Sequence, residues 1–461
     1  MRLRHSNDPA TDRSLRHSIR DGVAYTVMSG GTETWFSAWA LHLQATASQI
    51  GFLASLPPLL GSLSQLLGAW LGRKAGRRRT IILWGASLQG AALLPMALLP
   101  LLVPHGAFAC VLLAAVLYFG GVNAAAPQWS SLMGDLVPED RRGRYFGLRN
   151  RLCSITGFTA LALSGLLLDT FSRRGLTTAG FLLIFASDIL ARAVSIWHLA
   201  RMHDPPGQVA ALRVPPIGQL WLTLRKSPFV RFSLFFSAMQ FGVAIASPFF
   251  VVYMLRDLGF SYRLFMGISA AAVIVQFLTL NHWGVVSDAL GNRRILRITG
   301  ALLPFLPVFW LFSAHPLYLV LIQAVSGTIW AGYSLSAGNF VYDLIPADRR
   351  ATLMAMHGVG GGLALFLGAV TGGWLVTTFP ERIGMAGLEW TPSSPLLGLF
   401  LVSGLVRLGI AGLLLPRLLD APGSPPATTP LVWRVTRFLP QAGLIFDIIG
   451  RRRREPPPPA P

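Results

Sequence analysis

The stretch DLVPEDRR, from Asp135 to Arg142, returns as DLIPADRR from Asp343 to Arg350. Six of the eight positions are identical, and the two copies start 208 residues apart. Other features recur in the same order at a similar distance, which indicates an internal repeat of about that length. They are Gly51 with Gly267, Gly68 with Gly284, and Arg192 with Arg407. We therefore expect two similar halves, with the repeated stretch at the same place in each.

The composition places these halves in a membrane. The chain has 461 residues, of which 53% are hydrophobic and only 13% are charged. In a soluble domain about a quarter of the residues are charged. The net charge of +20 would suggest a nucleic-acid partner in a soluble protein. Here the basic residues lie between long apolar runs, so we expect them to face membrane lipid and not nucleic acid.

Long apolar segments follow one another along the chain, and each has the roughly 17–25 residues that a helix needs to cross a bilayer. Only helices and closed barrels satisfy their backbone polar groups in lipid, and these runs are too long and too uniform for barrel strands. We predict an all-α membrane protein with twelve transmembrane helices in two pseudo-symmetric six-helix bundles. The predicted helices span 22–44, 48–71, 80–102, 107–131, 144–169, 177–201, 229–255, 263–287, 294–314, 317–342, 351–378 and 396–418.

Basic residues give these helices a direction, because cytoplasmic segments are enriched in Lys and Arg. With the N-terminus inside, the cytoplasmic segments hold 32 of the 39 basic residues and the outer loops hold five. Two large clusters are GRKAGRRR at 72–79 and RRGRYFGLRNR at 141–151. We expect both termini in the cytoplasm, a basic rim against anionic lipid, and a location in the inner (plasma) membrane of a bacterium.

The connections between the helices define the domains. The longest interior connection carries DPPGQ and PP, which indicates a cytoplasmic linker. Two parallel halves related by an axis along the membrane normal enclose a site at their interface near the midplane. The predicted order is a cytoplasmic tail at 1–21, a six-helix bundle at 22–201, the linker at 202–228, a second bundle at 229–418, and a partly disordered cytoplasmic tail at 419–461.

A loop motif gives the chain a family resemblance. GVVSDALGNRR, from Gly284 to Arg294, connects the eighth and ninth predicted helices, and GAWLGRKAGRRR, from Gly68 to Arg79, lies at the matching place in the first half. Together with the twelve spans and the linker, these motifs resemble the major facilitator superfamily of secondary transporters over about residues 20–420. Gly72 stands where the family has Asp, and the first loop has one extra residue. The residues that fit are Gly68, Gly76, Gly284, Asp288, Gly291, Arg293 and Arg294.

The resemblance implies a gate at the cytoplasmic surface. It implies that Asp288 latches the two halves in the outward-facing state against the start of the fifth helix near Arg144, where free N–H groups favour negative charge. An ordinary surface acid beside Arg293 is the alternative. The repeated stretch is expected to act at the same surface, or to provide only turn chemistry and a topology signal. Its candidate gate residues are Asp135, Asp140, Arg141, Asp343, Asp348 and Arg349.

The first predicted helix carries one acid, Glu33, near the middle of the membrane. A buried carboxylate is costly in lipid and usually functional, and removal from water disfavours its charged form. We expect Glu33 to couple protons or contact solute, with a structural hydrogen bond as the alternative. The resemblance implies that helices 1, 4, 7 and 10 line a central cavity. The candidate cavity residues are Ser29, Glu33, Ser37, Asn123, Gln128, Gln240, Trp330 and Tyr333.

Asp188 and Arg192 lie one turn apart on the sixth predicted helix, which is the spacing of an intrahelical ion pair. We predict an intramembrane ion pair, with a proton relay as the alternative. The histidines are scattered at different depths, so no metal site is expected. Neither lysine lies in a Gly-rich phosphate loop, and we therefore expect no nucleotide cofactor.

The favoured function is a secondary active transporter that moves a small solute by alternating access, coupled to protons through Glu33. The alternatives are an uncoupled facilitator, or a non-transporting membrane sensor or scaffold on the same fold. An enzyme is not expected, because no carboxylate or histidine pair is placed for catalysis. We expect a monomer whose partners are the solute, protons and membrane lipid.

Overall fold

The computed structural model describes residues 8–75, 77–138, 142–204, 227–345, 350–378, 383–385, 388–390 and 393–418. The backbone of Asp288 and of Arg144 is described, but their side chains are not. The latch between them therefore stays a prediction. Other predicted features lie outside the described residues, namely Gly76, Asp140, Arg141, Asp348, Arg349, most of the linker 202–228 and the tail 419–461.

The first half is built from helices joined by short connections. Its helices are α1 (Pro9–Thr32), α2 (Phe36–His42), α3 (Ala47–Ala75), α4 (Arg78–Leu102), α5 (Ala107–Leu136), α6 (Arg142–Arg173) and α7 (Thr177–Leu199), with 3-10 turns at Glu33–Trp35 and Pro104–Gly106.

The second half repeats this order. Its helices are α9 (Pro228–Ala246), α10 (Phe249–Val252), a π turn (Tyr253–Asp257), α11 (Tyr262–Leu290), α12 (Asn292–Leu302), α13 (Phe305–Phe309), α14 (Pro316–Leu344), α15 (Arg350–Thr378) and α16 (Pro395–Leu414). A small antiparallel hairpin of β1 (Ile383–Met385) and β2 (Leu388–Trp390) precedes α16, with Gly384 opposite Glu389. The sequence did not predict this hairpin.

Short polar residues start several helices. The Asp8 carboxylate accepts a hydrogen bond of 2.8 Å from the backbone N–H of Thr11, and Ser227, Ser261 and Ser394 cap α9, α11 and α16 in the same way. Such caps satisfy N–H groups that have no partner within the helix. The cap at Asp8 explains why α1 begins inside the segment 1–21 that was predicted to be a tail.

The all-α fold class is confirmed, and nine helices in the described part of the chain are long and apolar enough to cross a membrane. The predicted spans 22–44, 48–71 and 294–314 are not among these nine. The first is interrupted by the turn at Glu33–Trp35, and the third is split between α12 and α13. The second corresponds to α3 (Ala47–Ala75), whose side chains are described only in part.

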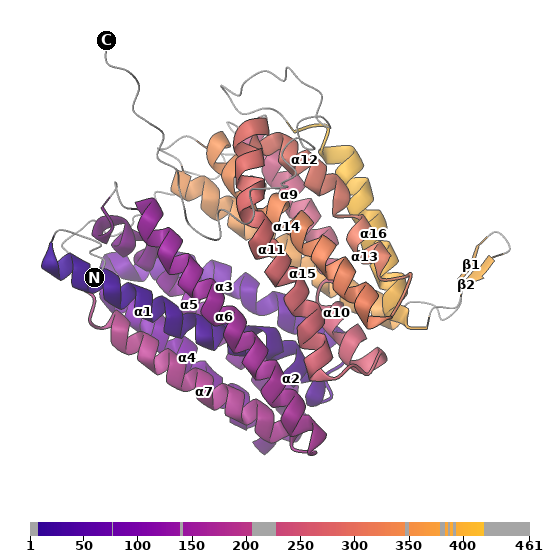
Figure 1. Cartoon of the computed structure of the whole chain (residues 1–461), viewed down its shortest axis with the longest axis horizontal. Helices are drawn as coiled ribbons and strands as arrows, with labels where there is room; N and C mark the ends of the chain where they lie inside the picture. Colours follow the sequence, from indigo (N-terminus) through magenta and orange to yellow (C-terminus); the bar gives the residue numbers. More distant parts are fainter. Residues whose placement is uncertain are drawn as a thin grey trace, which may run out of the picture.

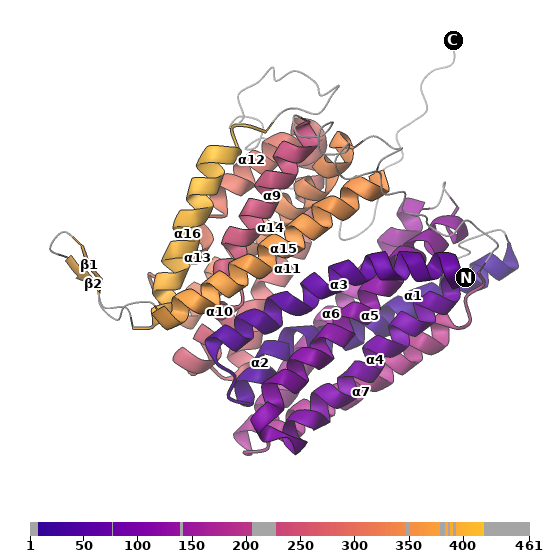
Figure 2. The same ribbon diagram turned by 180° about the vertical axis from the view of Figure 1, so that it is seen from behind.

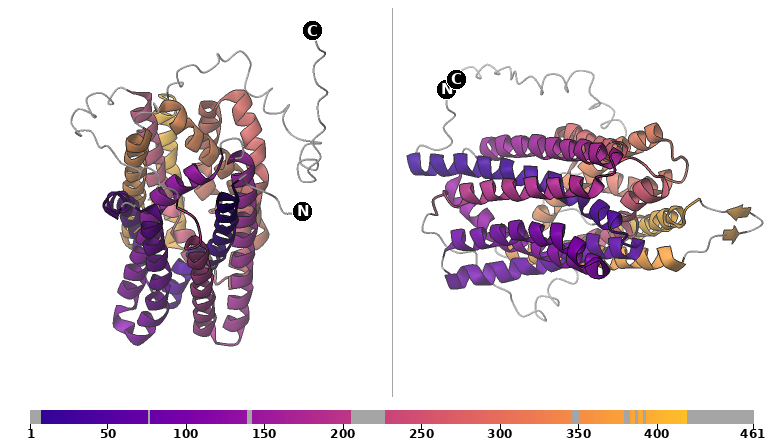
Figure 3. Two further views of the ribbon diagram at one scale, coloured as in Figure 1. Left: turned by 90° about the vertical axis from the view of Figure 1, so that its left-hand side faces the viewer. Right: turned by 90° about the horizontal axis from the view of Figure 1, so that it is seen from below.

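The two halves form two bundles, coloured indigo to magenta and rose to yellow in Figure 1. Figure 2 shows α3 and α15 lying side by side where the two bundles meet, and Figure 3 shows the helices of each bundle running along a common direction. The bundles meet near α2 and α10 and are farther apart at the starts of α1 and α12. Where they meet, Ser48 donates a hydrogen bond of 2.9 Å to the carbonyl oxygen of Gly373, and the Trp35 ring packs against Phe265.

The repeated stretch has equivalent contacts in both halves. Asp135 accepts a hydrogen bond of 2.6 Å from Arg78 at the start of α4, and Asp343 accepts one of 2.8 Å from Asn292 at the start of α12. Arg78 is 2% exposed and also binds Asp204, at the end of the first half. In the described part of the chain, both aspartates therefore join helices of their own half. These contacts agree with the turn-chemistry interpretation.

The two motif glycines differ in their surroundings. A Cβ atom on Gly68 would overlap the carbonyl oxygen of Ala124, because α3 and α5 approach closely there. A Cβ atom on Gly284 would meet no described atom within 4 Å. Gly291 has a φ of +83° where α11 gives way to α12, a conformation that glycine adopts without strain.

Gly68→Ala should therefore destabilise the first half, while Gly284→Ala at the equivalent place serves as a matched control. Forcing an extra methyl group into a packed contact costs about 1–3 kcal/mol, whereas Ala in an open helical position is favoured over Gly by about 1 kcal/mol. Thermal unfolding of the two purified variants in detergent measures the difference. Equal midpoints would show that the contact between α3 and α5 is looser than described.

Candidate functional site

The first transmembrane helix is broken within its length. α1 ends at Thr32, and a 3-10 turn that includes Glu33 leads into α2. The Thr32 hydroxyl donates a hydrogen bond to the buried carboxylate of Asp188 on α7. A Cβ atom on Gly31 would collide with the same carboxylate, so α1 and α7 are in close contact at the break. This contact holds the chain in place directly before Glu33.

Glu33 lines a cavity of about 400 Å³ between the two halves. Its side chain is exposed to this space, and one carboxylate oxygen accepts a hydrogen bond of 3.0 Å from the Tyr118 hydroxyl on α5. Tyr118 is itself buried and packs edge-on against Phe36 and Phe119, which fixes the position of its hydroxyl. The polar groups of the cavity wall come from both halves: Glu33, Thr34, Ser37, Ser247, Ser269 and Gln323.

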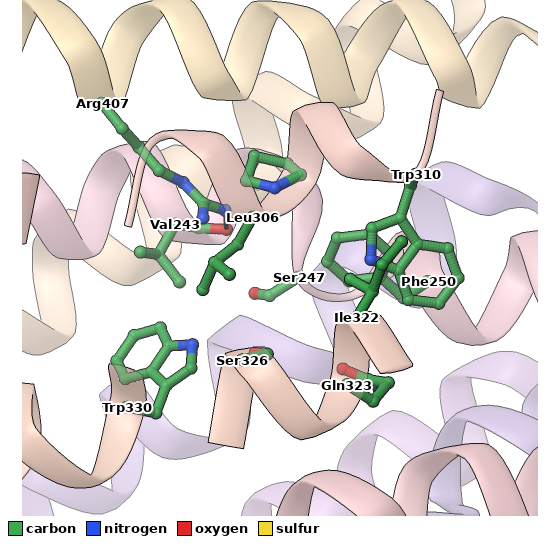
Figure 4. Close-up of a pocket in the computed structure, with 11 residues that line it drawn as sticks. Val243, Ser247, Phe250, Leu306, Trp310, Ile322, Gln323, Ser326, Trp330 and Arg407 are labelled. Carbon is green, nitrogen blue, oxygen red and sulfur yellow. Dashed lines mark hydrogen bonds between the residues drawn. The ribbon is translucent and has the colours of Figure 1, made fainter. Parts of the chain in front are cut away.

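A second, smaller cavity of about 60 Å³ lies within the second half. Ser247, Phe250 and Gln323 line both cavities, so the two are direct neighbours. Figure 4 shows Arg407 reaching the smaller cavity from α16, opposite Trp330 on α14. The larger cavity thus presents a carboxylate, and the smaller one a guanidinium.

Three of the eight predicted cavity residues line these spaces. Glu33 and Ser37 line the larger cavity, and Trp330 lines the smaller one. Tyr333 is buried away from both and stacks on Phe236. It lies one turn from Trp330, whose ring it contacts edge-on, but it does not reach the smaller cavity.

The two predicted cavity residues of α5 point towards α3 instead. Asn123 accepts a hydrogen bond of 2.9 Å from the Gln65 side chain, and the buried Gln128 amide approaches the carbonyl oxygen of Gly68 at 3.5 Å. Both therefore support the packing of two helices of the first half. Ser29 and Gln240 are half-buried and line neither cavity.

The sequence did not single out Ser269 and Gln323, which line the larger cavity, or Tyr118, which donates a hydrogen bond to Glu33. Tyr118 lies on the fourth transmembrane helix, which the family resemblance places at the cavity, so that pattern contained a signal for it. Gln323 lies on the tenth for the same reason. Ser269 lies on α11, the eighth helix, and nothing in the local sequence separates it from an ordinary packing serine.

The predicted ion pair between Asp188 and Arg192 is wrong. Asp188 accepts its hydrogen bond from Thr32, while Arg192 donates to the carbonyl oxygen of Ala86 at 3.3 Å and to the Ser195 hydroxyl at 2.9 Å. One-turn spacing brings two side chains to the same face, but each of these turns towards a different neighbouring helix. Asp188 faces α1, and Arg192 faces α4.

Arg192 is instead linked to another acid. The Ser195 hydroxyl that accepts from Arg192 donates a hydrogen bond of 2.7 Å to the buried carboxylate of Asp21. Asp21 also lies 3.8 Å from the guanidinium of Arg149. The described His, Cys, Asp and Glu residues include no group of three that could hold a metal ion.

Two helical bundles with a polar cavity between them define a membrane transporter fold. The chain belongs to the Major Facilitator Superfamily, whose family model matches residues 23–281 and 232–452. It is therefore an integral membrane protein of a transporter family and not an enzyme. A search of curated protein sequences finds no match.

Solved transporter structures share the fold at low sequence identity. The nucleoside transporter NupG is 14% identical with a TM-score of 0.65, covering 88% of this chain and 98% of that chain. The D-xylose-proton symporter is 14% identical with a TM-score of 0.67, covering 89% and 97%. A bacterial homologue of the iron transporter ferroportin matches in its inward-facing state with a TM-score of 0.67 and 15% identity, covering 88% of this chain and 98% of that chain. In its outward-facing state the TM-score is 0.59 and the identity 16%, with 88% of this chain and 99% of that chain covered.

Proposed function

We propose that this chain is a secondary active transporter that binds a small solute between its two halves and couples its movement to protons through Glu33. The position of Glu33 carries the proposal: its carboxylate is the one acid among the residues described as lining the larger cavity. A carboxylate within the membrane region of a protein is energetically costly, and such residues are usually functional. Tyr118 offers it a hydrogen-bond donor from outside the cavity wall.

Alternating access is supported by where the halves touch. The contacts of Ser48 with Gly373 and of Trp35 with Phe265 lie near α2 and α10, at the ends far from the start of α1. If both termini are cytoplasmic, as the basic residues predict, this arrangement is closed outside and open inside. The better fit to the inward-facing ferroportin homologue agrees with this assignment. We propose a monomer in a bacterial inner membrane, surrounded by lipid.

The proposal is tested by uptake into proteoliposomes. Thermal-shift screening of the purified protein against metabolites and drugs provides the solute, because a ligand that binds only the folded state raises the unfolding temperature. We expect labelled solute to accumulate inside above its outside concentration when a proton gradient is imposed. Uptake that only equilibrates identifies an uncoupled facilitator. Binding without any uptake identifies the sensor or scaffold.

A further inference from the structure

Arg407 is a buried cation that lacks an acidic partner in the described part of the chain. It is 3% exposed. Its guanidinium donates to three backbone carbonyl oxygens, of Gly242 at 3.3 Å, Leu303 at 3.2 Å and Val243 at 3.3 Å. These contacts hold the group between α9, the end of α12 and α16 but leave its charge uncompensated. A buried charge without a partner of opposite sign is costly, and more so within a membrane.

The equivalent arginine of the first half has an acid nearby. Arg192 also donates through Nε to a carbonyl oxygen, that of Ala86, but its second donor reaches Asp21 through the Ser195 hydroxyl. On α16 the nearby serine, Ser403, instead donates to the carbonyl oxygen of Gly242. The two halves therefore place an arginine at matching positions, and among the residues whose side chains are described only the first half provides a carboxylate for it.

The groups around the smaller cavity are suited to bind a partner of opposite charge that enters it. Five side chains with polar atoms line it with Arg407: Ser247, Trp310, Gln323, Ser326 and Trp330. Within the described chain none of their side chains has a hydrogen-bond partner, and each has a donor to offer. Figure 4 shows them around one space, with the guanidinium above Ser247 and the Trp330 indole on the opposite side.

The size and the remaining wall limit what can enter. The cavity measures about 60 Å³ and is also lined by Phe250, Leu306, Trp310 and Ile322, so it has room for a small group and not for a whole solute. Through the shared residues Ser247 and Gln323 it adjoins the larger cavity, which has room for the rest of a molecule. A planar anion beside a guanidinium is the arrangement that gives two parallel hydrogen bonds.

We propose that the smaller cavity is an anion subsite, in which Arg407, Ser326 and Trp330 bind the carboxylate of the transported solute while its body lies in the larger cavity. This inference rests on the proposed transport function and adds a substrate class to it. The solute is an organic acid with a short body. Glu33 lines the larger cavity and not the smaller one, so it is free to exchange protons without contacting the carboxylate.

The test is equilibrium binding to the purified full chain, with no gradient and no transport. The probes are sodium acetate, butyrate and benzoate at equal ionic strength, with the neutral amides of the same acids and sodium chloride as comparisons. We expect at least one carboxylate to raise the unfolding temperature with its concentration, and the amides and chloride to leave it unchanged. Isothermal titration then gives the affinity.

Variants assign the binding to Arg407. Arg407→Gln should lower the binding affinity for the carboxylate at least about tenfold, since a hydrogen-bonded charge pair is lost. Ser326→Ala and Trp330→Phe should each lower this affinity about threefold or more. Both keep Arg407 and its carbonyl contacts, so they test the site even if Arg407→Gln fails to fold. Ser403→Ala is the matched control, because Ser403 shares the Gly242 carbonyl with Arg407 but lines neither cavity. It should bind as the wild type does.

Two results would overturn the inference. Carboxylates that bind Ser326→Ala, Trp330→Phe and Arg407→Gln as tightly as the wild type would place their site elsewhere. If chloride binds and none of the carboxylates does, the smaller cavity is a site for an inorganic ion only. Failure of the transport proposal looks different: carboxylates would bind through Arg407, yet liposomes would take up none of them. If the protein instead takes up a neutral solute with protons, and Arg407→Gln does not affect this uptake, the transport proposal holds. The proposal that the solute is an organic acid is then wrong.

Discussion

Glu33→Gln is expected to abolish proton-driven accumulation while leaving the fold and some solute binding intact. Glutamine keeps the size of the side chain and can still accept a hydrogen bond from Tyr118, but it cannot carry a proton. With one proton per solute, a gradient of one pH unit sustains about a tenfold solute gradient, since one pH unit corresponds to about 1.4 kcal/mol. In the variant this ratio should fall to one. The measurement is uptake in proteoliposomes with and without the imposed gradient.

Tyr118→Phe is the graded comparison for this variant. It removes the hydroxyl that contacts Glu33 but keeps the ring that packs against Phe36 and Phe119. Coupling should weaken without being lost. If Glu33→Gln responds to the gradient as the wild type does, Glu33 is not the coupling residue. Asp188, which lies behind Thr32 at the helix break, would then be the next acid to replace.

The positions of the helices could be predicted because lipid imposes a strong local condition on sequence. A segment must be long and apolar enough to span, and the described helices begin within a few residues of most predicted ones. The breaks could not be predicted in the same way. The turn at Glu33–Trp35 directly follows the contact of Thr32 with Asp188, which lies 156 residues further along the chain. A window of sequence around Glu33 contains no sign of that contact.

The site was less predictable because helical spacing describes one helix at a time. Asp188 and Arg192 have the spacing of a pair, yet each bonds to a different neighbouring helix. The same limit applies to Arg407. Its repeat partner, Arg192, could be recognised in the sequence, but the cavity beside Arg407 is assembled from α9, α10, α13, α14 and α16. Only the fold shows that one arginine has an acid nearby while the other faces a polar cavity.

A cross-link between the halves should stop transport reversibly. The contact of Ser48 on α3 with Gly373 on α15 lies where the two bundles meet. A Cβ atom on Gly373 would lie 3.5 Å from the Cβ atom of Ser48, which is within the range of roughly 3.5–4.5 Å found in disulfides. The double variant Ser48→Cys with Gly373→Cys should therefore form a disulfide on mild oxidation.

Alternating access requires this contact to open when the cavity turns towards the outside. Oxidation of the double variant should reduce solute uptake to the level of protein-free liposomes, and a thiol reductant should restore it. The single variants Ser48→Cys and Gly373→Cys, treated in the same way, control for the lost hydrogen bond, for the added side chain and for the native Cys110 and Cys153. Both native thiols are free in the structure. Full uptake by protein whose disulfide has been verified would mean that the halves do not separate at α3 and α15, because a covalent bond there would otherwise hold the outer side closed.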